Sequence, residues 1–130
     1  MRQCYLFALI VFAGSGCSSP PPKPTTFPAI GKVQFTGGKP FVGGVISFTS
    51  TADPRLVMEA PIADDGTFEL SMMHGDQRVN GAMDGKYNVM VSSKFDGRNA
   101  VKVYMLPQPY SIEQKSNELV INVDSSMVKK

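Results

Sequence analysis

The sequence of 130 residues contains no tryptophan, two cysteines and a single histidine, His74. One histidine leaves no His-His or Cys-His spacing of the kind that zinc sites use, and no Ser-His-Asp or paired-carboxylate pattern accompanies it. His74 with Asp76 and Asp84 offers three donors in one segment, but donors without a regular ligand spacing usually belong to solvated loops. We therefore expect no catalytic residues, no metal and no cofactor.

Charge of one sign is also scarce. The 13 Lys and Arg residues nearly balance the 11 Asp and Glu residues, and the formal net charge is +2. The basic residues are scattered along the chain, so the sequence predicts no concentrated basic stretch. This distribution argues against nucleic acid as a partner.

Long hydrophobic runs are absent as well. The longest apolar run, residues 4–13, has ten residues, whereas a membrane-spanning helix needs about 20. Arg2 precedes this run and the small residues 14–16 follow it. That order of charge, apolar run and small residues is typical of a secretory signal peptide. We therefore predict that residues 1–16 are a signal peptide and that the mature protein is exported.

Cys17 directly follows the small residues, and this arrangement resembles the signal of bacterial lipoproteins. The resemblance implies cleavage before Cys17 and acylation of its thiol and new amine with chains such as palmitate. Gly14 departs from the family pattern, which prefers Leu or another aliphatic residue at that position. Secretion as a soluble protein without a lipid is the alternative.

Cys17 would be the only cysteine of such a mature chain, because Cys4 lies inside the predicted signal peptide. An intrachain disulfide is then excluded. Each buried methylene contributes about 0.8 kcal/mol, so several acyl chains on Cys17 would bind a lipid bilayer firmly. We expect the protein to be membrane-anchored on the periplasmic or outer-surface side, with the bilayer as a partner.

Residues 17–28 contain five prolines and have neither a helical nor a strand period. Proline rings favour the extended polyproline II conformation, which has no internal hydrogen bonds. Cys17 and this Pro-rich segment are therefore predicted to form a semi-rigid linker between the lipid and the folded domain.

Residues 29–125 show apolar residues with a period of two, which is typical of half-buried β-strands. Gly- and Asp-containing turns separate these runs, and no stretch has a convincing helical period. About seven short strands predict an all-β, Greek-key β-sandwich for residues 29–125, followed by a tail of residues 126–130. The residues expected to face the core are Val33, Phe35, Ile46, Phe48, Phe68, Leu70, Met72, Tyr87, Val89, Val91, Leu119, Ile121 and Val123.

Two segments between the predicted strands are long, residues 73–84 and residues 95–99 with their flanks. Loops held by a rigid sheet commonly carry binding surfaces. The candidate ligand-contact residues are His74, Asp76, Arg78, Tyr104 and Tyr110. An envelope protein or a polysaccharide is the expected partner, and for a glycan the aromatic faces would come from Phe95, Tyr104 and Tyr110.

Four motifs follow one another in the predicted domain. They are G-K-P followed by V-I-S-F in residues 38–48, D-D-G-T-F in residues 64–68, G-K-Y-N-V-M-V in residues 85–91 and L-P-Q-P-Y in residues 106–110. Together they resemble the carboxypeptidase regulatory-like, transthyretin-like domains over residues 30–123. The resemblance implies a seven-stranded prealbumin-like sandwich that is usually non-catalytic.

A related fold is that of 5-hydroxyisourate hydrolase, whose site uses several histidines, an arginine and a C-terminal Tyr-Arg-Gly-Ser tail. This sequence has one histidine and ends in Met127-Val128-Lys129-Lys130. We therefore expect a non-enzymatic cell-envelope lipoprotein that acts as a binding or structural module. A glycan-binding module is the alternative, and an enzyme similar to 5-hydroxyisourate hydrolase is a less favoured one.

Overall fold

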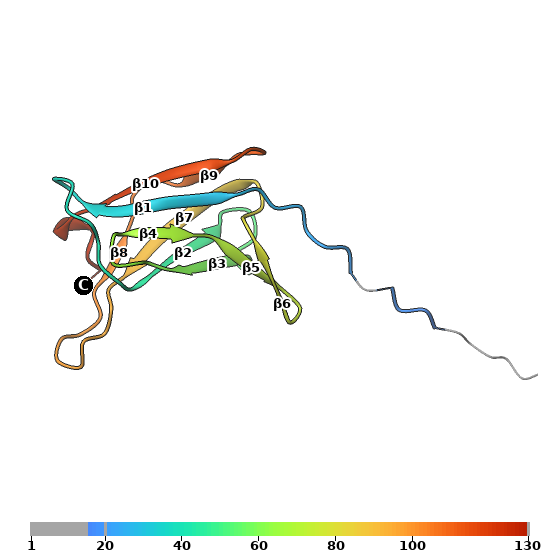
Figure 1. Ribbon diagram of the computed structural model, residues 1–130, viewed down its shortest axis with the longest axis horizontal. Coiled ribbons are helices and arrows are strands. Elements are labelled where there is room, and N and C mark those ends of the chain that lie inside the picture. The colour runs from blue at the N-terminus through green and yellow to red at the C-terminus, as the bar shows by residue number, and fades with distance from the viewer. Residues whose placement is uncertain (1–15, 20, 130) are drawn as a thin grey trace, which may run out of the picture.

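The structure is a computed structural model and describes residues 16–19 and 21–129 (Figure 1). The predicted signal peptide lies outside the described residues except for Gly16, and so do Pro20 of the predicted linker and Lys130 of the predicted tail. Two β-sheets form a sandwich, so the expected all-β class is confirmed. Among the described residues, no helix is long and apolar enough to cross a membrane.

The smaller sheet has three strands in the order β10-β1-β4. β1 (Ala29–Phe35) lies between β10 (Asn117–Val123) and β4 (Thr67–Glu69). β1 pairs with β10 in parallel and with β4 antiparallel. Figure 1 shows β1 and β10 running side by side along the length of the domain.

The larger sheet has seven strands, of which the two longest, β2 (Val45–Ser50) and β7 (Gly85–Ser92), pair with each other. Its other strands are β3 (Val57–Pro61), β5 (Ser71–His74), β6 (Gln77–Asn80), β8 (Val103–Met105) and β9 (Tyr110–Ile112). The order is β6-β5-β3-β2-β7-β8, and β9 pairs with the first residues of β7. β6 and β8 therefore lie at opposite edges of this sheet.

The described residues contain ten strands, whereas the sequence predicts about seven. Residues 67–72 look like one strand in the sequence, but the chain changes sheets at Leu70, between β4 and β5. The Leu70 N–H donates to the Ala29 carbonyl at 2.9 Å, and its carbonyl accepts from the Gly81 N–H at 2.8 Å. Leu70 is fully buried. The apolar alternation continues through this corner, which is why periodicity alone does not locate the break.

Ten of the thirteen residues predicted to face the core are buried. The other three, Phe35, Met72 and Leu119, are partly buried and pack against it. The core also contains residues that the sequence did not single out, among them Phe41, Met58, Ile62 and Ile112. The prediction of the buried face is therefore correct for most strands. Side chains alternate between the two faces of a strand, so in a strand with one buried face every second side chain points inward.

Asn117 fixes the start of the parallel pair of β1 and β10. Its side chain is buried, and its Nδ2 donates to the carbonyls of Pro28 (3.2 Å), Glu113 (3.0 Å) and Lys115 (2.7 Å). Its Oδ1 accepts from the Glu113 N–H at 2.9 Å. One amide thus shapes the turn that leads into β10 and ties this turn to the residue before β1.

We expect Asn117→Asp to lower the free energy of unfolding by about 3 kcal/mol, because a carboxylate oxygen would replace the Nδ2 donor and face three carbonyl oxygens. Asn122→Asp is the matched control. Asn122 is exposed and its Oδ1 only accepts from Gln34 Nε2, so a change within about 0.5 kcal/mol is expected. Urea unfolding measures both variants, and equal effects would show that the Asn117 network does not stabilise the pairing.

Candidate functional site

Residues 73–84 were predicted as a loop, and this prediction is wrong. They contribute to a hairpin of β5 and β6, with His74 paired to Gln77 in register. Gly75 occupies the first position of the two-residue turn with a φ of 62°, a conformation that glycine adopts readily. His74, Asp76 and Arg78 therefore lie on a tight hairpin, where the short Gly-Asp turn signal in the sequence could have placed them.

Tyr104 and Tyr110 lie apart from this hairpin. Tyr104 of β8 is 7% exposed and packs edge-on against Phe41, with ring centroids 5.7 Å apart. Tyr110 of β9 is half-buried, and burial raises the pKa of its hydroxyl. Because β6 and β8 are opposite edges of the larger sheet, the structure does not bring the five candidate residues into one site. The buried ring of Tyr104 is not an exposed aromatic platform.

The linker contacts the hairpin side of the sandwich. Phe27 and Ala82 exchange two backbone hydrogen bonds, at 2.8 and 2.9 Å, and Thr26 Oγ1 donates to the Asn80 carbonyl at 2.8 Å. Further along, His74 Nε2 lies 3.3 Å from the Pro21 carbonyl oxygen. The linker thus joins the domain beside β6, before β1 begins. Cys17 is exposed at the far end of this segment.

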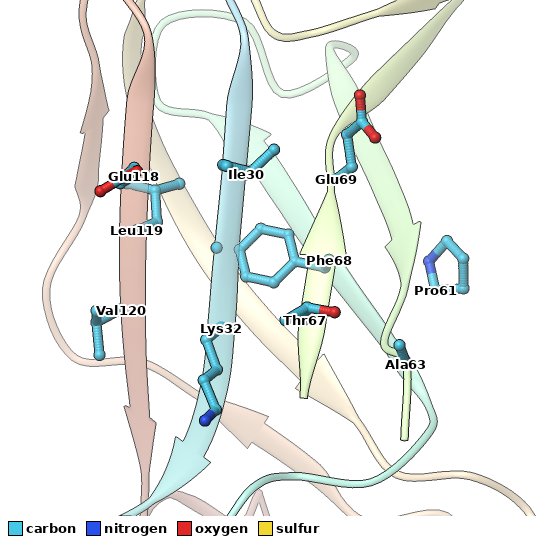
Figure 2. A pocket seen from close by; sticks show the side chains of 11 residues that line it. Ile30, Lys32, Pro61, Ala63, Thr67, Phe68, Glu69, Glu118, Leu119 and Val120 are labelled. Atoms are coloured by element: carbon cyan, nitrogen blue, oxygen red, sulfur yellow. The ribbon is translucent and has the colours of Figure 1, made fainter. Parts of the chain in front are cut away.

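One groove, of about 600 Å³, lies on the smaller sheet (Figure 2). Its central residues are Ile30 and Lys32 of β1, and both neighbouring strands contribute to it. Figure 2 shows the Phe68 ring lying between β4 and β1, and its Cζ would be 2.5 Å from a Cβ built on Gly31. Glu69 and Glu118 flank Ile30 in register, so the groove carries charges of both signs. We call this surface the sheet groove.

A second groove, of about 480 Å³, lies between the loop that joins β1 to β2 and the loop that joins β7 to β8. We call it the lysine groove. Its lining includes Lys39, Phe41, Lys94, Asp96, Lys102 and Tyr104. No sequence pattern singles out the three lysines, because Lys39 belongs to one loop and Lys94 and Lys102 to another that is far from it in the sequence. Figure 1 shows the two loops at the end of the domain opposite to the linker.

The base of the lysine groove is a cluster of three aromatic rings. Phe35 and Phe41 have centroids 5.3 Å apart, and Tyr104 meets both rings edge-on at 6.4 and 5.7 Å. Such tilted and edge-to-face pairs stabilise a core beyond the area that they bury. The groove is therefore lined by three lysines and by a packed aromatic cluster.

The sides of the lysine groove are held by backbone contacts. The Ser93 N–H donates to the Lys102 carbonyl at 2.8 Å, and the Lys102 N–H donates to Ser93 Oγ at 2.9 Å, which closes the β7–β8 loop at its neck. Where the two loops meet the paired strands β2 and β7, Gly44 has a φ of 87°, and a Cβ built on it would lie 2.1 Å from the Ser92 carbonyl oxygen. Only glycine permits this close approach of the two loops.

Among the described residues, Asp96 is the only acidic one that lines the lysine groove. Its Oδ1 accepts from the Asn99 N–H at 2.7 Å and from the Arg98 N–H at 2.9 Å, while its Oδ2 accepts from Asn99 Nδ2 at 2.8 Å. These bonds lower the pKa of the Asp96 carboxyl group to about 2. The carboxylate is therefore engaged in shaping its own loop.

Among the described residues, no group of three or more His, Cys, Asp and Glu side chains is placed to hold a metal ion. In comparisons with known proteins, no family model, no curated protein and no solved structure matches this chain.

We expect an NMR titration of the Asp96 carboxyl group to give a pKa of about 2. This pKa lies below the unfolded value of about 3.9. The stabilisation by the charged form is therefore complete above about pH 4 and is lost as the pH falls towards 2. The Asn99 amide should shift with the same midpoint. A midpoint at the unfolded value would contradict the hydrogen bonds that close this turn.

Proposed function

We propose that the protein is an exported, non-enzymatic binding module that a lipid on Cys17 anchors at the cell envelope. The observation that carries the proposal is the opposite placement of linker and loops. The chain from Cys17 joins the sandwich at the Phe27–Ala82 bridge, whereas the two loops that border the lysine groove lie at the other end of the domain (Figure 1). This arrangement suits a module that meets its partner away from the anchoring membrane.

The reach of the linker agrees with such a role. The contacts of Thr26 and Phe27 with the domain leave residues 17–25 as the spacer, and within it the Pro21 carbonyl lies 3.3 Å from His74 Nε2. In polyproline II geometry a spacer of this length extends about 28 Å. The exposure of Cys17 is compatible with acylation of its thiol and amine. With the order of charge, apolar run and small residues before Cys17, this favours a lipoprotein over a protein secreted in soluble form.

A non-catalytic role is supported by the surroundings of the single histidine. Among the described residues, the one side-chain hydrogen bond of His74 is with the Pro21 carbonyl. General acid-base catalysis requires a proton carrier oriented by a partner and directed at a substrate. A backbone carbonyl of the linker supplies neither a nucleophile nor a carboxylate.

Membership of the carboxypeptidase regulatory-like group is part of the proposal. The motifs that carry the resemblance lie at turns and strands, as they do in that family. Gly38-Lys39-Pro40 precedes β2, and Asp65-Gly66 forms the turn before β4. Tyr87, Val89 and Val91 are the buried residues of β7. The Leu106-Pro107 motif leads into β9, and one further strand follows it.

Glycan binding is the second candidate, and Phe95 favours it. Phe95 is 66% exposed in the loop between β7 and β8. Exposed aromatic rings stack on the apolar faces of sugars. Tyr104 is buried and Tyr110 is half-buried. Of the three aromatic residues considered for sugar stacking, Phe95 therefore has the most exposed side chain.

The lipid anchor is tested by the intact mass of the protein purified from its native membranes. We expect a chain that begins at Cys17 and carries three acyl groups. Cys17→Ser removes the thiol, so the precursor should keep residues 1–16 and gain no acyl mass. Ser18→Ala is the control and should leave processing and acylation unchanged.

A chain that is cleaved near residue 16 but carries no lipid would contradict the anchor and make the protein a soluble secreted module. A chain that keeps residues 1–16 in the native protein would contradict export through this signal. Either result leaves the binding surfaces of the sandwich to be tested separately.

A further inference from the structure

We propose that the lysine groove binds an anionic polysaccharide, whose negative groups contact the ammonium groups of Lys39, Lys94 and Lys102. This inference rests on the proposed role as a binding module, but it does not depend on acylation of Cys17. The chemistry that recognises the ligand is a groove lined by three lysines and an aromatic cluster, with the exposed Phe95 on one of its two loops.

The charge balance of the groove points to an anion. Its lining includes three lysines and one acid, Asp96. Both Asp96 oxygens already accept hydrogen bonds from Arg98 and Asn99. In the part of the chain that the structure describes, none of the three lysines forms an ion pair, and the two ion pairs present, Arg55 with Asp53 and Lys115 with Glu113, lie elsewhere. The positive charge of the groove is therefore left for a ligand.

Two other hollows do not have this excess of positive charge. The sheet groove combines Lys32 with Glu69 and Glu118. A hollow beside β3 and β5 contains Arg55 and Arg78, but Arg55 pairs with Asp53 and Glu59 lines the same hollow. Charge complementarity thus selects the lysine groove for an anionic partner.

The groove is also preorganised. The Ser93–Lys102 hydrogen bonds close one loop at its neck, and the Phe35 N–H donates to the Lys39 carbonyl at 2.8 Å in the other loop. Gly44 seats the two loops against each other. Because the backbones of both loops are already held by these contacts, ligand binding needs to order mainly the lysine side chains. The conformational entropy lost on binding is therefore small, which favours a higher affinity.

Size and position favour a polysaccharide over a small anion or the anchoring bilayer. A hollow of about 480 Å³ is in the range that accommodates drug-sized ligands. Phe95 directly follows Lys94 and offers an exposed ring on the same loop, where a sugar next to a charged one can stack. The two loops that border the groove lie at the end of the domain opposite to the linker, and so away from the segment that leads to Cys17 (Figure 1).

The test uses the full chain in detergent and titrates it by calorimetry with polygalacturonate, dextran sulfate and neutral dextran. We expect binding to at least one charged polymer, weakening as salt is raised, and no binding to dextran. The first two polymers distinguish a carboxylated from a sulfated ligand. Phosphatidylglycerol vesicles, matched in charge concentration, test an anionic membrane as the partner.

The decisive variant is Lys39→Gln, Lys94→Gln and Lys102→Gln combined. It should bind the charged polymer at least about tenfold more weakly, because each exposed charge pair contributes a factor of about two to five. The control combines Lys32→Gln, Lys86→Gln and Lys115→Gln, which removes the same charge elsewhere and should change affinity less than about twofold. Phe95→Ala should weaken binding with the salt dependence unchanged.

Three results would overturn the proposal: no binding of the unaltered chain to either charged polymer, an equal loss in the groove and control variants, or binding to the vesicles with none to the polymers. All six lysines lie outside the buried core, so both triple variants should fold. Circular dichroism of each variant checks this. Failure here with an acylated Cys17 would leave the lipoprotein proposal intact. Binding here with an unmodified Cys17 would leave a secreted glycan-binding module.

Discussion

The parallel pairing of β1 with β10, closed by the Asn117 side chain, is the constraint on which the rest of the structure depends. It joins segments 89 residues apart at the contact between Asn117 and Pro28. Parallel strands cannot be joined by a tight turn, so the larger sheet must form within the connection. The pairing also fixes where the linker leaves the domain, because Phe27 lies just before β1 and bonds to Ala82.

Much of the fold is predictable from the sequence because burial in a sandwich follows a period of two. Val33, Phe48 and Ile121 are fully buried, as their alternation predicts. The errors occur at corners, where alternation carries no information about which sheet a strand joins. Leu70 is buried, as the alternation predicts, although the chain passes from one sheet to the other at this residue. The β5–β6 hairpin was missed for a different reason, since its Gly75-Asp76 turn was interpreted as part of a longer loop.

The candidate site is much less predictable. The sequence groups His74 and Tyr104 as candidate ligand-contact residues, yet β5 and β8, which carry them, are separated by three strands of the larger sheet. Lys39, Lys94 and Lys102 have no common motif, and their proximity follows from two loops that meet at one end of the sandwich. A scattered charge in the sequence can therefore become a local excess of charge in the fold. The net charge of +2 does not reveal this local excess of positive charge.

The attachment of the linker links the anchor to the groove. If the chain left the domain freely at β1, a tethered sandwich could present any face to its surroundings. The Thr26 and Phe27 hydrogen bonds instead hold the linker against β6, so the free part begins before residue 26. In the proposed lipoprotein, the spacer therefore leaves the domain beside β6, whereas the loops that border the lysine groove lie at the opposite end (Figure 1). A partner that binds these loops is then not obstructed by the point of attachment.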